Sequence, residues 1–186
     1  MKLILKIFFL SFCIDTFCLS ENQSIILKVD YNNLKDIDHQ KTGSFLVASK
    51  TIKHLMTANI SIKNTQDKTD DFILEWYFFS RRINGEKDFK IINYGKEEIT
   101  LKNYEEKEIL KKASEVSFTN TAEKKGKSIP YAKITKFGFK AYGYIVLVKN
   151  NADEILKQNI HPKILEKFVK EPDKLKALLD EKMIKS

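Results

Sequence analysis

The chain has 186 residues, of which 33 are lysine or arginine and 25 are aspartate or glutamate, so its formal net charge at neutral pH is +8. Both cysteines, Cys13 and Cys18, lie near the N-terminus, and the sequence beyond them excludes a disulfide-stapled scaffold and a thiolate metal site. The remaining length suits one domain, and its core has to be held together by packing alone.

The first 20 residues have the pattern of a secretory signal peptide. Lys2 and Lys6 precede the apolar run IFFLSFCI, which is too short to span a membrane, and a cut after Ser20 follows small residues. A lipoprotein signal would place a small residue before the modified cysteine, whereas phenylalanine precedes both Cys13 and Cys18. We therefore expect an exported protein, periplasmic or extracellular, with no integral membrane span after cleavage. A lipid anchor is the alternative.

The mature sequence opens with strand patterns. Residues 25–31 and 56–63 alternate apolar and polar side chains, which is the period of a strand with one buried face. Between them, the polar residues 32–43 are predicted to form a loop and residues 44–48 a short strand. Residues 64–71 are polar again and end the second long strand.

The longest apolar stretch beyond the leader is residues 71–85, which contain the single tryptophan. Read at the two-residue period of a strand, both of its faces are largely apolar. One face carries Phe72, Leu74, Trp76 and Phe78, and the other carries Ile73, Glu75, Tyr77, Phe79 and Arg81. A strand that is apolar on both faces needs a cover on each, and one cover can be a second sheet.

A hairpin is predicted to follow this strand. Asn84 and Gly85 would supply the two positive-φ positions of a tight turn, and residues 89–94 would return as the next strand.

The part after this hairpin is also predicted to be mostly strand. Residues 98–102 alternate as a further strand, and residues 115–119 continue extended before a lysine-rich loop at residues 122–128. Residues 105–116 fit two structures, because their apolar residues have helical spacing while a turn at residues 103–104 would link two strands at sandwich spacing. We favour the strand.

A second strand with two apolar faces follows. Residues 131–149 end in GYIVLVK, whose side chains are apolar in both directions, so we expect this strand beside the tryptophan strand. Gly138 and Gly143 within it indicate a bulge or bend. We assign the aromatic residues interleaved with lysines at residues 136–144 to the core rather than to a stacking platform. Residues 150–159 then form a turn and a returning strand.

The apolar period changes to that of a helix only near the C-terminus. Pro162 fits the first position of one helix, and Pro172 ends it and opens a second. The apolar stripes consist of Ile164, Leu165, Phe168 and Val169 in the first helix and Leu175, Leu178, Leu179 and Met183 in the second. Neither helix is long enough to be stable alone in water, so we predict that the pair covers the outer face of one sheet. The covered side chains would be Tyr77, Phe79, Ile145 and Leu147.

Several segments occur in an order that resembles a known family. They are the strand LEWYFF, the following FKIINYGKEEITL, the late GYIVLV and a tail with two proline-started helices. This order resembles an uncharacterised family of exported bacterial immunoglobulin-like β-sandwich proteins with a short C-terminal helical tail. The resemblance implies no catalytic or binding residue, and it supports the strand at residues 105–111.

The expected fold class is therefore mainly β. It is an antiparallel immunoglobulin-like β-sandwich with two short C-terminal α-helices packed on one sheet. The expected organisation is a signal peptide at residues 1–20, a β-sandwich domain at residues 21–160 and a helical tail at residues 161–186.

The residue patterns of common active sites do not occur in the mature sequence. It has no cysteine nucleophile, no G-x-S-x-G motif and no glycine-rich phosphate loop. His39, His54 and His161 lack the spacing of zinc ligands, and the aspartates at residues 67–71 lack the glycine of a calcium loop. We therefore predict no catalytic residue, no metal ligand and no cofactor.

The candidate ligand contacts are basic residues in two clusters. They are Arg81 and Arg82 after the central strand and Lys124, Lys125 and Lys127 in the lysine-rich loop. One interpretation is an ordinary solvated surface, because acidic residues are interspersed almost everywhere. The functional interpretation is contact with an anionic envelope component, such as lipid headgroups, cell-wall polymer or polyanionic sugar, while nucleic acid is not expected for an exported protein.

The leading hypothesis is a non-enzymatic exported protein that acts through contacts, as an envelope-associated interaction or structural module. Its partner would be an unknown protein or an anionic envelope polymer. The alternative is a carbohydrate- or anionic-polymer-binding module. That alternative predicts that at least two aromatic residues are exposed in a row, drawn from Trp76, Tyr77, Tyr94, Tyr104 and Tyr142. A hydrolase is the third hypothesis, and it predicts a carboxylate pair, or a histidine with an acid partner, in one cleft.

Overall fold

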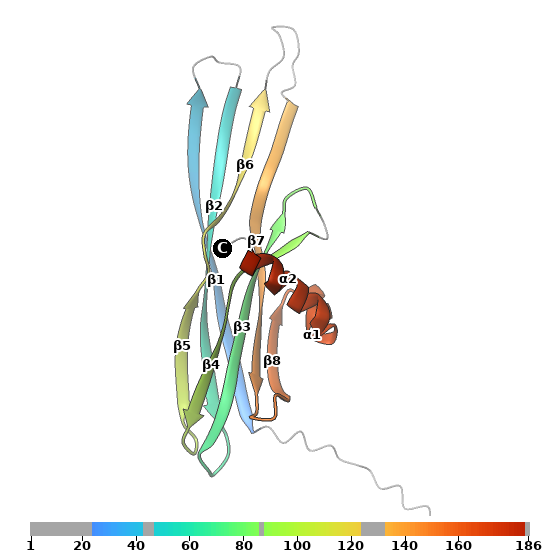
Figure 1. The fold of residues 1–186 in the computed structure, drawn as a ribbon. Helices are drawn as coiled ribbons and strands as arrows, with labels where there is room; N and C mark the ends of the chain where they lie inside the picture. The colour runs from blue at the N-terminus through green and yellow to red at the C-terminus, as the bar shows by residue number, and fades with distance from the viewer. Residues whose placement is uncertain (1–23, 43–46, 86–87, 124–132, 185–186) are drawn as a thin grey trace, which may run out of the picture.

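The computed structural model describes residues 24–42, 47–85, 88–123 and 133–184 (Figure 1). In this part of the chain, eight antiparallel strands are followed by a short 3₁₀ turn and two α-helices. The predicted signal peptide, residues 1–20, lies outside the described residues.

The strands are β1 (Ile25–Thr42), β2 (Val47–Asn64), β3 (Asp70–Arg82), β4 (Phe89–Leu101), β5 (Glu106–Lys112), β6 (Val116–Glu123), β7 (Lys133–Lys149) and β8 (Ile155–His161). The helical elements are η1 (Lys163–Leu165), α1 (Glu166–Lys170) and α2 (Pro172–Ile184).

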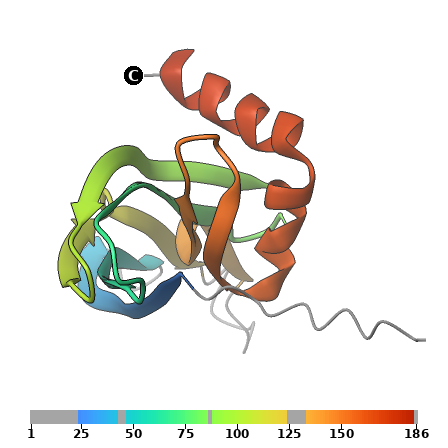
Figure 2. The same cartoon turned by 90° about the horizontal axis from the view of Figure 1, so that it is seen from below.

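Strand β7 belongs to two sheets. Its first part, residues 133–138, pairs with β6 in a sheet that continues through β2 to β1. Its second part, residues 139–149, pairs with β3, which is followed by β4, and its last residues also pair with β8. In the lower half of Figure 1 the two sheets face each other, and Figure 2 shows these two layers with the helices as a third. The molecule is therefore a sandwich from which part of one sheet extends.

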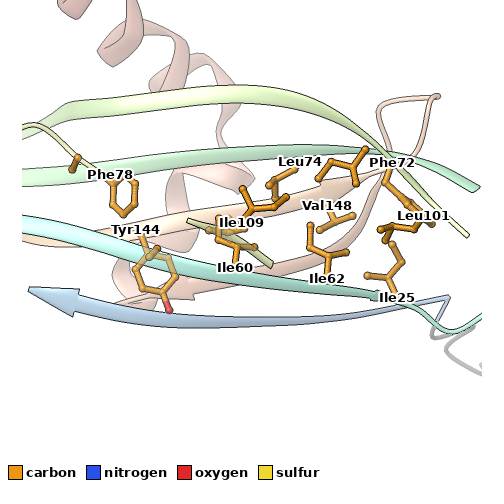
Figure 3. Packing of buried hydrophobic residues seen from close by; sticks show 14 of the residues in the cluster. Ile25, Ile60, Ile62, Phe72, Leu74, Phe78, Leu101, Ile109, Tyr144 and Val148 are labelled. Atoms are coloured by element: carbon orange, nitrogen blue, oxygen red, sulfur yellow. The ribbon is translucent and has the colours of Figure 1, made fainter. Parts of the chain in front are cut away.

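The main core lies between the two sheets (Figure 3). The alternation of each strand directs every second side chain inward. The buried inward residues include Ile60 and Ile62 of β2, Phe72, Leu74 and Phe78 of β3, and Val146 and Val148 of β7. Burying each such side chain stabilises the fold by about 1.5–3 kcal/mol. One predicted face of the central strand is thus confirmed as the face against the second sheet.

A second core lies on the other face of β3 and β7, under the helices. Phe79 of β3 stacks on Phe168 of α1 with ring centroids 5.4 Å apart, and Leu165 is fully buried. All four side chains that were predicted to be covered, Tyr77, Phe79, Ile145 and Leu147, belong to this cluster. The predicted fold class is confirmed as mainly β, an antiparallel sandwich with two short C-terminal helices packed on one sheet.

The start of the helical tail differs from the prediction. The first turn, η1, is a 3₁₀ helix, which has three residues per turn instead of 3.6. Ile164 is therefore exposed rather than part of the buried stripe, while Leu165 remains buried.

The loop predicted at residues 32–43 is wrong. Strand β1 continues to Thr42 and pairs residue by residue with β2, as far as Thr42 opposite Val47. Of the short strand predicted at residues 44–48, the last two residues begin β2 and the others lie outside the described residues. The segment was missed because its described side chains do not alternate between buried and exposed. The sequence therefore lacks the two-residue apolar period that usually indicates a strand.

We call the extended part of this sheet the arm. It consists of residues 33–42 of β1, 47–55 of β2, 116–123 of β6 and 133–138 of β7, and it projects beyond the sandwich (Figure 1).

The connection from β3 to β4 is longer than the predicted tight turn. Asp88 carbonyl oxygen accepts a 3.0 Å hydrogen bond from the Arg82 N–H, so the chain reverses over residues 83–87. Neither Asn84 nor Gly85 has a positive φ, because a loop of this length does not need one. The hairpin itself is confirmed.

The two strands predicted at residues 89–94 and 98–102 are one strand, β4. Gly95 lies directly opposite Trp76, and a Cβ atom there would come within 2.1 Å of the indole ring. The glycine that looks like an interruption in the sequence is therefore the position that makes room for the tryptophan ring.

The ambiguous segment is strand β5, as favoured. Ile109 is buried and Leu110 is exposed, which is strand alternation, and Tyr104 forms the preceding turn with a φ of 57°. The bend predicted at Gly138 and Gly143 is also confirmed. Gly138 has a φ of 110°, and the pairing of β7 with β3 shifts register beside Gly143.

Candidate functional site

The four strands of the arm are in register, so their side chains form rows across the sheet. One row runs from His39 to Lys50 to Asn120 to Lys136. The neighbouring row on the same face runs from Ile37 to Ile52 to Phe118. This face continues the side of β1 and β2 that lines the main core, and we call it the inner face. The opposite side is the outer face.

Charge is sorted between the two faces. On the inner face lie Lys35, Lys50 and Lys136 together with His39 and His54. On the outer face lie Asp36, Asp38 and Lys53. Among the described side chains of the arm, every carboxylate is therefore on the outer face. The inner face has a positive potential that no carboxylate of its own neutralises.

An open cleft of about 360 Å³ lies on the inner face. It is lined by His39, Ser49, Lys50, Asn120, Ala122, Ile134 and Lys136. Neighbouring strands are about 4.8 Å apart, so the polar side chains of one row can reach a common ligand. The cleft combines ammonium, imidazole and amide groups with apolar walls.

His54 lies at the base of this face and is 6% exposed. Its Nδ1 lies 3.0 Å from the Asn33 Oδ1, and its ring stacks on Phe118 with centroids 5.8 Å apart. Burial lowers the pKa of His54, and the nearby Lys35 and Lys140 lower it further. The ring is therefore neutral at neutral pH and supports the sheet rather than adding charge to it.

The two predicted arginines do not lie in this cleft. Arg81 stacks on Tyr142 at 4.7 Å, and Arg82 pairs with Asp88 at 3.2 Å. Consecutive residues of a strand point to opposite faces, so the two guanidinium groups do not form one site. The other predicted contacts, Lys124, Lys125 and Lys127, lie outside the described residues.

Sequence reasoning missed the cations of the inner face. Lys35 and His39 were assigned to a loop, Lys50 was not singled out, and Lys136 was noted only among the lysines interleaved with aromatic residues at positions 136–144. The signal that could have found them is the separation of lysines and aspartates onto alternate positions along residues 35–39. That signal has a meaning only if the segment is a strand, because alternate residues of a strand point to opposite faces.

The aromatic residues do not form the predicted row. Trp76 lies under Lys111, with the ammonium 4.0 Å from the ring, and Tyr77 is buried by the helices. Tyr94 and Tyr104 are exposed, but the first lies within β4 and the second in the turn after it. Within the interleaved segment at residues 136–144, Tyr144 is in the core as predicted, whereas Phe137 is 58% exposed.

A second opening, a groove of about 390 Å³, lies between the helices and the lower part of β3 and β7. Its floor holds Lys149, whose ammonium lies 3.0 Å from a Glu75 oxygen and 3.1 Å from an Asp153 oxygen. The Tyr77 hydroxyl donates a 3.1 Å hydrogen bond to Glu75. The two carboxylates of the groove thus share one ammonium group.

Glu75 and Asp153 place two carboxylates in one groove, which is the arrangement that the hydrolase hypothesis predicts, and both contact the Lys149 ammonium. Burial lowers the pKa of Lys149, but hydrogen bonds to Glu75 and Asp153 outweigh that effect and raise the net pKa above its ordinary value. Burial and the Glu75 carboxylate raise the pKa of Tyr77. Both groups keep their protons at neutral pH, and the cluster resembles a buried ion pair of the kind that neutralises its own charges.

Two further observations concern the described residues. They contain no group of three or more His, Cys, Asp or Glu side chains placed to hold a metal ion. None of their helices has both the length and the apolar character that crossing a membrane requires.

Neither a protein-family model nor a curated protein sequence matches the chain. Among solved structures, β-glucuronidase 2 of Bacteroides uniformis matches over 61% of this chain and 14% of its own, with 13% identity and a TM-score of 0.23. DesR, a β-glucosidase of Streptomyces venezuelae, matches over 71% of this chain and 14% of its own, with 10% identity and a TM-score of 0.28. The structural-genomics target SoR45 matches over 66% and 87%, with 12% identity and a TM-score of 0.32. The chain thus corresponds to about 14% of the length of each glycosidase, and overlaps of this extent transfer no activity.

Proposed function

We propose that the protein is a non-enzymatic, exported binding module that contacts an anionic polymer of the cell envelope through the inner face of its arm. The observation that carries this proposal is the sorting of charge, with lysines and histidines on the inner face and the described carboxylates on the outer face. An ordinary solvated surface would mix the two signs on each face.

The shape of the arm supports the same function. The described residues of the arm belong to neither core, and the arm presents a cleft of about 360 Å³ to solvent. Electrostatic attraction to a polyanion falls with salt, because bound counterions are released when lysines neutralise the polymer.

The experiment compares binding of the purified protein to dextran sulfate and to uncharged dextran. Lys50→Glu reverses a charge on the inner face, and Lys53→Glu makes the same change on the same strand on the outer face. We expect wild-type protein to bind dextran sulfate only, in a salt-dependent manner, and Lys50→Glu to weaken binding about tenfold.

The matched outer variant decides the outcome. Lys53→Glu should bind nearly as the wild type does, because its side chain faces away from the polymer. Equal weakening by the two variants would reduce the effect to net charge, and unchanged binding by Lys50→Glu would remove the inner face as the site.

A further inference from the structure

The inner face of the arm alternates cationic and apolar rows. From the sandwich outward, the Lys35–His54 row is followed by the Ile37–Ile52–Phe118 row and then by the row that ends at Lys136. The next row runs in register from Lys41 to Ala48, Ala122 and Ile134, so it is apolar from β2 to β7 and has a lysine at its β1 end. Successive rows on one face are two residues apart, which is about 6.6–6.8 Å.

Each of these two apolar rows carries an exposed isoleucine, while Ile52 and Phe118 beside Ile37 are half-buried. Ile37 is 46% exposed and Ile134 is 63% exposed, and each lies next to lysine side chains. A polar residue could replace either isoleucine at no cost to the core. An apolar group that covered both isoleucines would remove their side chains from water and so favour binding.

We propose that the inner face selects an anionic polysaccharide, a polymer in which sugar rings separate carboxylate or sulfate groups. This inference rests on the proposed function and names the ligand class for the same face. The charged groups would lie on the row from His39 to Lys136, where each lysine offers three hydrogen-bond donors. The C–H faces of the rings would cover Ile37 and Ile134.

Other polyanions match the rows less well. A linear polyphosphate carries charge on every unit and no apolar surface, so it would satisfy the lysines and leave the isoleucines in water. An anionic lipid has its charge at one end and its apolar part at the other. Its charged and apolar parts therefore do not alternate as the rows of the inner face do. Only a polymer with ring faces between its charges covers both kinds of row along one direction.

The experiment measures the affinity of the purified protein for chondroitin sulfate and for linear inorganic polyphosphate, at equal charge concentration and equal ionic strength. The test variant is Ile37→Ser with Ile134→Ser on the inner face. The control is Leu34→Ser with Phe137→Ser, which removes side chains that are 55% and 58% exposed on the outer face of the same two strands.

We expect wild-type protein to prefer chondroitin sulfate about tenfold, and the inner variant to lose that preference while its affinity for polyphosphate stays the same. The outer variant should retain the preference. Because all four side chains are exposed, both variants should fold, and their circular dichroism spectra should match that of the wild type.

The two proposals fail in different ways. Equal or tighter binding of polyphosphate by the wild type, tighter binding to vesicles of anionic phospholipid, or an undiminished preference in the inner variant would overturn the polysaccharide inference. In each of those cases the proposed function stands if Lys50→Glu still weakens polyanion binding. If neither polymer binds, or if Lys50→Glu has no effect, the proposed function fails and the inference fails with it.

Discussion

The sandwich and the arm share strands β1, β2 and β7 but are stabilised in different ways. In the sandwich, β3 is buried on both faces, against the second sheet by Phe78 and against the helices by Phe79. In the arm, β1 continues with Leu34 and Ile37 exposed on opposite sides, and the described residues of β2 are half-buried apart from the buried His54. Side-chain burial therefore stabilises the strands of the sandwich, while β1 of the arm leaves side chains at the surface on both faces.

The largest expected effect tests burial directly. Phe78→Ala should lower the free energy of unfolding by about 3–5 kcal/mol, because it leaves a cavity between the sheets. Ile37→Ser in the arm should change it by about 0.5 kcal/mol or less, because the side chain is already exposed. Urea unfolding of the two variants measures both values. A similar loss from both would show that the arm is as dependent on packing as the sandwich.

The next effect concerns the ion pair beneath the helices. Lys149→Met should destabilise the protein by about 3 kcal/mol, because Glu75 would keep a buried charge without its main partner. Glu75→Gln combined with Lys149→Met should recover part of that loss, since no buried charge is left unpaired. If the double variant is no more stable than Lys149→Met alone, the pair is not the cause.

The same cluster predicts an alkaline limit. The pKa values of Lys149 and Tyr77 are raised in the folded state above the ordinary values of 10.5 and 10.0, so their contribution is fully present below pH 10. It is lost as the pH rises further, because the unfolded chain then releases these protons more readily. The stability of the wild type should therefore fall more steeply above pH 10 than that of the Lys149→Met variant, as measured by urea unfolding.

The smallest effect belongs to the arm. The pKa of His54 is lowered in the folded state, so the contribution of the neutral ring is present above its ordinary value of 6.5 and is lost as the pH falls below it. Hydrogen exchange of the amides of β2 and β6 near His54 should therefore be relatively faster at pH 5 than at pH 7, after correction for the intrinsic rate. His54→Gln should remove this difference, and amides around Phe78 serve as the internal reference.

Burial decided which parts of the fold could be predicted. Two strands, those of Phe78 and Leu147, are apolar on both faces. This pattern predicted both a second sheet and a helical cover, and both covers are present. The arm was missed because residues 32–39 have no buried face, so the polar sequence of this segment resembles a loop. Strand β4 was predicted as two strands, because the need for Gly95 opposite Trp76 depends on a partner that comes from a different strand.

The candidate site depends on information that the sequence does not display locally. Lys50 and Lys136 come together only because β6 pairs with both β2 and β7 in one register. A shift of one residue in any pairing would move a whole row to the other face. Charge sorting is therefore a property of the pairing of distant segments, and propensity and composition alone do not reveal it.

Strand β7 has a mechanical consequence. The strand that displays Lys136 on the arm continues without a break to Val146 in the sandwich, where it is flanked by β3 on one side and β8 on the other. A load applied to a polymer held at the arm would pass down this strand as shear, resisted by two ladders of hydrogen bonds at once. If the arm holds a polymer as proposed, the hydrogen bonds of β7 to both β3 and β8 would hold the other end of the strand in the sandwich.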